Sequence, residues 1–412
     1  SLKKLFKIRF RLGMFDPADK NPYAHISENV LESDAHRQQA LKMARQSMVL
    51  LKNDKSLLPL SRKYKKIVLT GPNANNETTQ LGNYNGFPTE NTTLLEALQK
   101  EKGIEVVYDQ LTDFTRMLQE TDTDKLLEKY KDADLIIYAG GISPLLEGEQ
   151  GDAGNGKEEG FYEGDRTSIA LPKVQTEVMK KLKELGKPLI FVCMSGSAVS
   201  YNWEAEHLSA VIQAWYGGQA AGTALTDILF GRYNPSGRLP LTFYRSDADL
   251  PPFEDYSMQG RTYRYFEGDV LYPFGYGLSY TTFKYRNLKV PSEAQTGDSV
   301  RVSVEVVNTG KMAGEEVVQL YLSHREMAEE APLCALKKFM KIKLKPNERR
   351  TVSFVLSPRE LAFVDLAGEI RQDAGTLKVF VGGVCPSAPQ RFTQGILSAS
   401  LQIQGESRSF LY

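Results

Sequence analysis

The sequence is poor in cysteine, contains no long apolar run and carries no net charge. Its 412 residues include three cysteines, which are too few and too scattered for a disulfide framework or a thiolate metal site. No apolar run approaches the roughly 18 residues of a membrane-spanning helix, so we expect no membrane partner. The 51 basic residues balance the 51 acidic residues. This balance argues against a nucleic-acid partner, because such proteins normally carry a basic surface.

Several motifs of common enzymes are also missing. The four histidines, His25, His36, His207 and His324, have no metal-ligand spacing. Ser195 lacks the GxSxG elbow of a serine hydrolase. The loop at residues 71–75 lacks both the GxGxxG spacing and the GK[ST] ending of phosphate-binding loops. We therefore expect no metal, no cofactor and no bound nucleotide.

Short apolar runs alternate with helical segments between residues 63 and 245. The runs occupy residues 67–69, 104–107, 135–138, 189–192 and 211–212, and the helical segments occupy residues 94–102, 174–185 and 220–230. This alternation predicts a parallel sheet covered by helices on both faces, which is an α/β sandwich. Ligands bind such sheets at the carboxyl ends of the strands. An amphipathic helix over residues 33–51 is expected to precede this domain.

A different pattern begins after a connecting segment rich in Tyr, Phe, Pro and Gly, at residues 246–285. Apolar residues alternate with polar ones at 300–306, and similar runs recur at 317–322, 338–344, 351–356 and 377–381. This period of two predicts a small antiparallel β-sandwich. The expected organisation is a tail and linker helix (1–62), the α/β sandwich (63–245), the connecting segment (246–285), the β-sandwich (286–385) and a C-terminal extension (386–412).

An acidic, glycine-rich loop follows the run at residues 135–138. A carboxyl group on such a loop can reach a cleft at the end of the sheet and serve as a general acid. For most of its acids, including Glu158, Glu159 and Glu163, a solvated charged loop is the better interpretation. Glu147 is the best candidate, since Leu145 and Leu146 can hold it against the sheet. We interpret Asp165 and Arg166, which end the loop, as a structural anchor.

Uncharged polar and aromatic residues follow the first strand of the predicted sheet. Asn73, Asn83, Tyr84 and Asn85 offer hydrogen bonds and a stacking face, which suit a sugar better than a phosphate. The competing interpretation is turn chemistry, because Asn readily caps and bends the backbone. Both interpretations remain open at this point.

About ten motifs along the chain resemble the C-terminal portion of family 3 glycoside hydrolases, in the order of that family. They include ARQSMVLLKN (44–53), LGNYNG (81–86), GISPLLEGEQ (141–150), GDRTSIALP (164–172), AWYGGQAAGTAL (214–225), FGRYNPSGRLPLTFY (230–244), RTYRYFEG (261–268) and YPFGYGLSYTTF (272–283). The resemblance implies an exo-acting β-glucosidase or β-xylosidase with an α/β sandwich followed by a fibronectin type III-like domain. It also implies a periplasmic or secreted location, although the chain shows no signal peptide.

The resemblance implies a two-domain active site. In the family, a TIM-like barrel carries the nucleophilic aspartate and the α/β sandwich carries the acid/base. By position the acid/base is Glu147, with Glu149 as the alternative, and Tyr84 and Asn83 are expected to bind substrate. Retaining glycosidases need both carboxyl groups. Since this chain matches only the tail of the barrel, we expect it to be inactive alone and to require that barrel as a partner.

Two functions remain compatible with the sequence. The first is the acid/base part of a retaining glycosidase acting on terminal β-D-xylosyl or β-D-glucosyl residues of oligosaccharides or aryl glycosides. The second is a carbohydrate-recognition or scaffolding fragment without turnover. Beginning at Ser1 rather than Met, the chain is expected to be a fragment of a longer protein.

Overall fold

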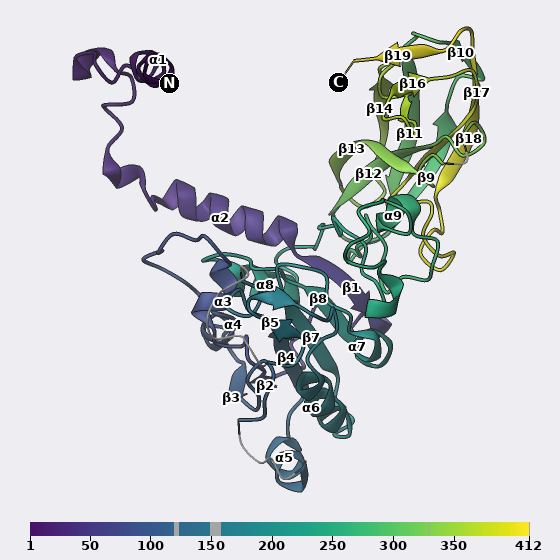
Figure 1. The fold of residues 1–412 in the computed structure, drawn as a ribbon. Helices are drawn as coiled ribbons and strands as arrows, with labels where there is room; N and C mark the ends of the chain where they lie inside the picture. Colours follow the sequence, from purple (N-terminus) through teal and green to yellow (C-terminus); the bar gives the residue numbers. More distant parts are fainter. Residues whose placement is uncertain (119–122, 149–157, 329, 412) are drawn as a thin grey trace.

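The computed structural model describes residues 1–118, 123–148, 158–328 and 330–411. An α/β unit is followed by a β-rich unit, and the two lie against each other, whereas the N-terminal helix stands apart at the end of an arm (Figure 1). The arm contains α1 (Leu2–Arg11) and leads into α2 (Asp34–Ser47).

The α/β unit is built around one sheet with the strand order β1-β8-β7-β4-β2-β3. Neighbouring strands run parallel, except that β1 is antiparallel to β8. The strands are β1 (Val49–Asn53), β2 (Lys66–Thr70), β3 (Glu105–Asp109), β4 (Leu135–Gly141), β7 (Leu189–Met194) and β8 (Ala210–Gln213). The predicted parallel sheet is therefore confirmed and gains an antiparallel edge.

The helix predicted through Leu51 was wrong at its C-terminal end. Helix α2 stops at Ser47, and the apolar residues that follow form β1, with Val49 paired to Gln213 and Leu50 to Ile212. Val49, Leu50 and Leu51 are all buried. An apolar run of this length suits a buried strand as well as a helix, and here pairing with β8 selects the strand.

Helices cover both faces of the sheet, as the apolar strands require. One core joins the sheet to α2, α4 and α8, and the other joins it to α6 and α7. Alternate residues of β4 supply the two cores, with Ile136 and Tyr138 on one face and Ile137 and Ala139 on the other. The helices of this unit are α3 (Glu77–Leu81), α4 (Leu94–Gln99), α5 (Thr123–Tyr130), α6 (Lys173–Lys183), α7 (Asn202–His207) and α8 (Ala221–Leu229).

The β-rich unit is a sandwich of two sheets, with the strand orders β10-β18-β17-β12-β13 and β14-β11-β9. Inward-facing Val302, Val304 and Val306 of β11 contribute to its core, as the alternating pattern predicts. The strands are β9 (Phe283–Lys289), β10 (Glu293–Gln295), β11 (Val300–Asn308), β12 (Gly314–Ser323), β13 (Ala335–Leu344), β14 (Arg349–Leu356), β17 (Gly375–Gly382) and β18 (Leu397–Gln404). The sheets are antiparallel except that β10 is parallel to β18.

Residues beyond the expected sandwich also join it. Strand β18 pairs with β17, although it lies in the segment expected as a C-terminal extension. A smaller sheet joins β15 (Phe363–Val364), β16 (Ile370–Gln372) and β19 (Arg408–Phe410). The connecting segment contains the short helix α9 (Thr262–Tyr265). Its neighbour Arg261 donates hydrogen bonds to three backbone carbonyls between residues 252 and 257.

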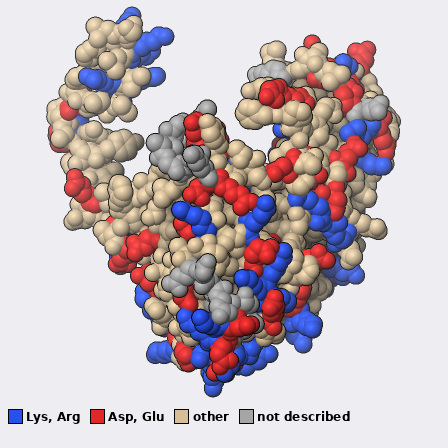
Figure 2. All heavy atoms as spheres, turned by 60° about the horizontal axis from the view of Figure 1, so that its bottom comes forward, with Lys and Arg blue, Asp and Glu red and all other residues tan. Residues whose placement is uncertain are grey.

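The surface carries charges of both signs in close mixture. Figure 2 shows Lys and Arg side chains interspersed with Asp and Glu over the face that it presents. Of the helices in the described ranges, none is both long enough and apolar enough to cross a membrane. Within the same ranges, His, Cys, Asp and Glu side chains form no cluster of three that could hold a metal ion.

Candidate active site

Glu147 lies at the end of the sheet with its carboxylate turned inward. Oε1 accepts hydrogen bonds from the backbone N–H of Gly196 at 2.7 Å and from the hydroxyl of Tyr216 at 2.5 Å. Oε2 accepts one from the hydroxyl of Ser197 at 2.5 Å. Three donors therefore hold this carboxylate in one position.

The topology explains why these residues meet. Glu147 follows β4, Gly196 and Ser197 follow β7, and Tyr216 follows β8. These three strands are parallel neighbours in the sheet, so their carboxyl ends share one edge. Burial and the nearby carboxylate of Glu147 raise the pKa of Tyr216, which keeps its hydroxyl protonated as a donor.

Gly196 permits the close approach of Glu147. A Cβ at this position would lie 2.9 Å from Oε1 of Glu147 and 2.9 Å from Cε2 of Tyr216. Both distances are shorter than van der Waals contact, so any larger residue would displace one of these groups.

Two buried amides fix the start of the acidic loop. Gln175 of α6 accepts from the N–H of Gly141 at 2.9 Å and donates to its carbonyl at 2.7 Å. Asn73 donates to the carbonyls of Gly140 at 2.9 Å and Ile142 at 3.3 Å. Asn73 thus bonds to the backbone, as one of the two interpretations expected, but to the distant end of β4 rather than within its own turn, and it fixes the start of the acidic loop.

Arg166 packs beneath the same site. Its Nη1 donates to the Ser197 hydroxyl at 2.8 Å and to the Ala198 carbonyl at 2.7 Å. Burial lowers the pKa of Arg166, and the nearby Glu147 carboxylate opposes that change. Arg166 stands in the hairpin of β5 (Phe161–Tyr162) and β6 (Asp165–Arg166). It thus ties the end of the acidic loop to the residues after β7, through a hydroxyl and a carbonyl.

Of the two other candidate binding residues, only Asn83 has a hydrogen bond to Glu147. Asn83 donates to the backbone carbonyl of Glu147 at 3.2 Å. Tyr84 projects from the surface, with 88% of its area exposed and a φ of 55°. Of the two leucines expected to hold the loop, Leu146 packs on the core and Leu145 is 67% exposed.

The remaining acids of the loop are placed apart from this carboxylate or lie outside the described part of the chain. Glu149 lies outside the described part of the chain. Glu158 is 3.5 Å from Arg116 and accepts a hydrogen bond from Thr115. Glu159 is 3.2 Å from Lys173. Glu163 occupies a turn with a φ of 47°.

Sequence reasoning missed Ser197 and Tyr216. Only Ser195 of this segment was considered, and only as a hydrolase nucleophile. The available signal was position, since both Ser197 and Tyr216 come directly after predicted parallel strands, where ligand-binding loops gather.

An apolar cavity of about 590 Å³ adjoins the site. Arg166 and Ser197 form part of its wall, and Leu241, Tyr244 and Phe274 of the following segment form another part. Aromatic and aliphatic walls with few polar groups are typical of small-molecule sites.

Comparison with known proteins agrees with this architecture. Residues 48–280 match the family described as "Glycosyl hydrolase family 3 C-terminal domain". Residues 316–384 match the family described as "Fibronectin type III-like domain". A xylan 1,4-β-xylosidase of Xylanibacter ruminicola is 31% identical, with 92% of this chain and 60% of the relative covered. A periplasmic β-glucosidase of Salmonella typhimurium is 32% identical, with 92% and 53% covered.

Solved structures give the same result. An exo-β-xylosidase in complex with a xylobiose aziridine activity-based probe superposes with a TM-score of 0.83 at 26% identity, covering 99% of this chain and 53% of that one. A β-glucosidase of Listeria innocua in complex with glucose gives 0.80 at 26% identity, covering 97% and 54%. The chain thus spans between about half and three fifths of the length of these relatives.

Proposed function

Because the chain belongs to glycoside hydrolase family 3, we propose that it supplies the general acid/base of an exo-acting retaining β-glycosidase, and that Glu147 is this residue. The substrates are terminal β-D-xylosyl or β-D-glucosyl residues, the sugars named for its relatives. The observation that carries the proposal is the Glu147 carboxylate, held by three donors at the ligand-binding edge of the sheet.

The hydrogen bonds assign different tasks to the two oxygens of Glu147. Oε1 accepts two bonds and Oε2 accepts one. Oε2 therefore keeps a free lone pair, and it is the oxygen that can carry a proton to the leaving group. The Ser197 hydroxyl donates to one lone pair of Oε2 and leaves the other for the proton, so its bond to Glu147 can persist in both protonation states. Arg166 donates to this hydroxyl and steadies it.

A retaining mechanism needs a second carboxyl group about 5–5.5 Å from the first. In our proposal a barrel domain supplies it as the nucleophile, and the chain alone forms no glycosyl-enzyme intermediate. The N-terminal arm supports docking of a further domain. Helix α1 has no buried residue and exposes Leu2, Leu5, Ile8 and Phe10, and Figure 1 shows it clear of the α/β unit.

The leaving-group side of the site is proposed to include Tyr84 and Asn83. Tyr84 exposes an aromatic face on which a sugar ring can stack, and Asn83 is fixed next to Glu147 by its hydrogen bond to the backbone. The adjoining apolar cavity offers room for the less polar part of an aryl glycoside.

The decisive experiment is kinetic and uses the longer protein that includes the barrel domain. Glu147→Gln should lower turnover by roughly 10²–10⁴ on glycosides with poor leaving groups. The loss should be smaller for activated aryl glycosides, which need little protonation, and azide should restore turnover by attacking the intermediate without a base. Turnover is measured on aryl β-xylosides and β-glucosides of graded leaving-group ability.

Two variants serve as controls. Glu159→Gln changes an acid of the same loop that is paired with Lys173, and it should leave the leaving-group dependence unchanged. Glu149→Gln tests the alternative acid. If Glu149→Gln shows the azide response and Glu147→Gln does not, the assignment to Glu147 is wrong. If the longer protein binds oligosaccharide without turnover, the chain is a recognition or scaffolding module.

A further inference from the structure

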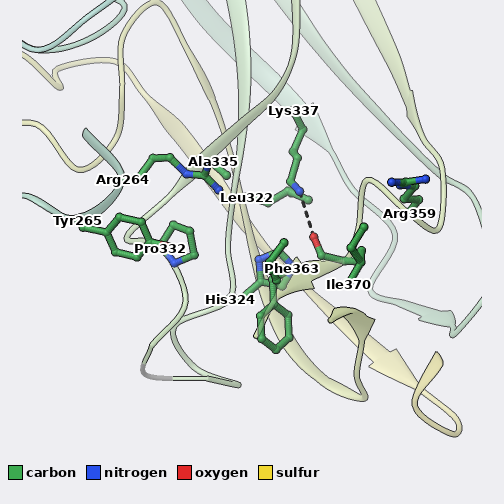
Figure 3. A pocket seen from close by; sticks show the side chains of 12 residues that line it. Arg264, Tyr265, Leu322, His324, Pro332, Ala335, Lys337, Arg359, Phe363 and Ile370 are labelled. Atoms are coloured by element: carbon green, nitrogen blue, oxygen red, sulfur yellow. Dashed lines mark hydrogen bonds between the residues drawn. The ribbon is translucent and has the colours of Figure 1, made fainter. Parts of the chain in front are cut away.

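A second cavity, of about 190 Å³, lies in the β-rich unit, away from Glu147. Its walls come from α9, from β12 and β13, and from residues 359–370. Figure 3 shows Arg264, Lys337 and Arg359 reaching it from separate segments of the chain. No Asp or Glu belongs to its lining in the described part of the chain. The cavity therefore collects positive charge without a matching carboxylate.

Lys337 is the most deeply placed of the three cations. Its Nζ donates to the carbonyl of Ala362 at 3.0 Å, the contact drawn as a dashed line in Figure 3. The nearest acid, Glu360, already forms an ion pair with Lys338 and accepts from the N–H and the hydroxyl of Ser357. A buried ammonium group is costly unless it is paired. Lys337 thus has donors left for a ligand.

Both arginines also keep their donors available. Arg264 and Arg359 are exposed on one side, and neither guanidinium group has a hydrogen bond or an ion pair within residues 1–118, 123–148, 158–328 and 330–411. A guanidinium group presents paired N–H donors that match two oxygens of a carboxylate, sulfate or phosphate.

The rest of the lining is neutral. His324 is buried, and its Nε2 lies 2.8 Å from the carbonyl of Leu361. Burial lowers the pKa of His324 to about 4, so near neutral pH this ring is uncharged. The cavity has the volume of about six water molecules, which suits a small ligand and not a polymer.

We propose that this cavity binds a small anion through an oxyanion group, with Arg264, Arg359 and Lys337 as the cations that contact its oxygens. The group is a sulfate, a phosphate or a carboxylate. It can belong to a free inorganic ion or to a single sugar acid, and the size of the cavity admits either. Arg264 also lines the apolar cavity that adjoins the Glu147 site, but the proposed anion contacts do not involve Glu147.

The proposal is tested by isothermal titration calorimetry on the whole chain at constant ionic strength. The probes are inorganic sulfate, inorganic phosphate and D-glucuronate, with D-xylose as the neutral control. We expect saturable binding of one or more anions and none of xylose. Binding of the inorganic ions alone identifies an inorganic-anion site, and tighter binding of glucuronate identifies a sugar-acid site.

Matched variants separate a built site from general surface charge. Lys337→Met and Arg359→Gln should each raise Kd about tenfold or more. Lys343→Met removes an exposed lysine of the same strand, β13, and should leave Kd unchanged. Arg359 is exposed, so its variant should fold even if Lys337→Met does not. Equal affinities in Arg359→Gln, Lys343→Met and the unmodified chain would overturn the proposal, as would the absence of saturable binding.

Binding should also depend on pH. Burial, and secondarily the charge of Arg264, lower the pKa of Lys337 to about 8. Arg264 and Arg359 are the other cations of the lining. The pKa of Glu360 lies below its usual range, since Lys338 and the Ser357 donors outweigh its partial burial, and the pKa of His324 is about 4 because of burial, so neither group changes its charge between about pH 7 and about pH 9. Affinity for sulfate, whose own charge is constant over this interval, should therefore fall in the unmodified chain and stay nearly level in Lys337→Met. A Kd in the unmodified chain that does not rise between these pH values would contradict the role given to Lys337.

Discussion

Replacing Glu316 by Gln should destabilise the contact between the two units by about 3–5 kcal/mol. Glu316 lies on β12, and its Oε2 is 2.9 Å from Nη2 of Arg238, which follows α8. The other oxygen accepts from the hydroxyl of Tyr285 at 2.8 Å. The side chains are 5% and 9% exposed. Glu316→Gln keeps the shape but leaves the buried guanidinium group of Arg238 without a counter-charge.

The intact pair is itself a weak source of stability. Burial raises the pKa of Glu316, in spite of the opposing attraction of Arg238. The free-energy cost of removing this carboxylate from water therefore exceeds the electrostatic stabilisation that Arg238 provides. It follows that replacing both members, as in Arg238→Met with Glu316→Leu, should recover most of the loss caused by Glu316→Gln.

Urea unfolding can follow the two units separately. Trp203 and Trp215, the two tryptophans of the chain, both lie in the α/β unit, so their fluorescence reports on that unit. Far-UV circular dichroism reports on both units. In Glu316→Gln we expect the dichroism transition to begin at lower urea than the fluorescence transition, because the β-rich unit loses its anchor.

The control is Glu348→Gln, which removes a more exposed pair. Glu348 is 3.0 Å from Arg350, and the two side chains are 35% and 47% exposed. Water screens such a pair, so we expect Glu348→Gln to change the free energy of unfolding little. The reasoning fails if Glu316→Gln costs no more than Glu348→Gln, or if the double variant is as unstable as the single one.

Two further predictions concern close packing and pH. Gly196→Ala should lower kcat of the longer enzyme about tenfold or more, with little change in the urea midpoint. The reason is that a Cβ at residue 196 would lie 2.9 Å from Oε1 of Glu147 and displace this carboxylate. Unchanged kinetics would show that catalysis does not require the carboxylate in this position. His324 should make the β-rich unit less stable in acid: burial lowers its pKa to about 4, whereas the unfolded chain takes up that proton near pH 6.5. The contribution of neutral His324 to the free energy of unfolding is therefore complete above pH 6.5 and decreases as the pH drops toward 4, by about 2 kcal/mol at pH 5. Urea titrations at pH 7 and pH 5 should show a smaller decrease in the free energy of unfolding for His324→Gln than for the unmodified chain.

Much of the fold was predictable because periodicity depends on local burial. The apolar runs of the α/β unit became β2, β3, β4, β7 and β8, and the alternating runs of the second unit became β11 to β14 and β17. β1 was not predictable in this way. Its apolar residues fit a helix and a buried strand equally well, and only the pairing with β8 decides between them.

For the candidate site, the sequence by itself determined that a carboxyl group stands on a glycine-rich loop after a buried strand, and the family motifs pointed to Glu147. It could not determine what holds that carboxylate. Ser197 and Tyr216 are 50 and 69 residues away along the chain. They reach Glu147 because β4, β7 and β8 are neighbours in the sheet, and strand order depends on packing between distant segments, which no local pattern records.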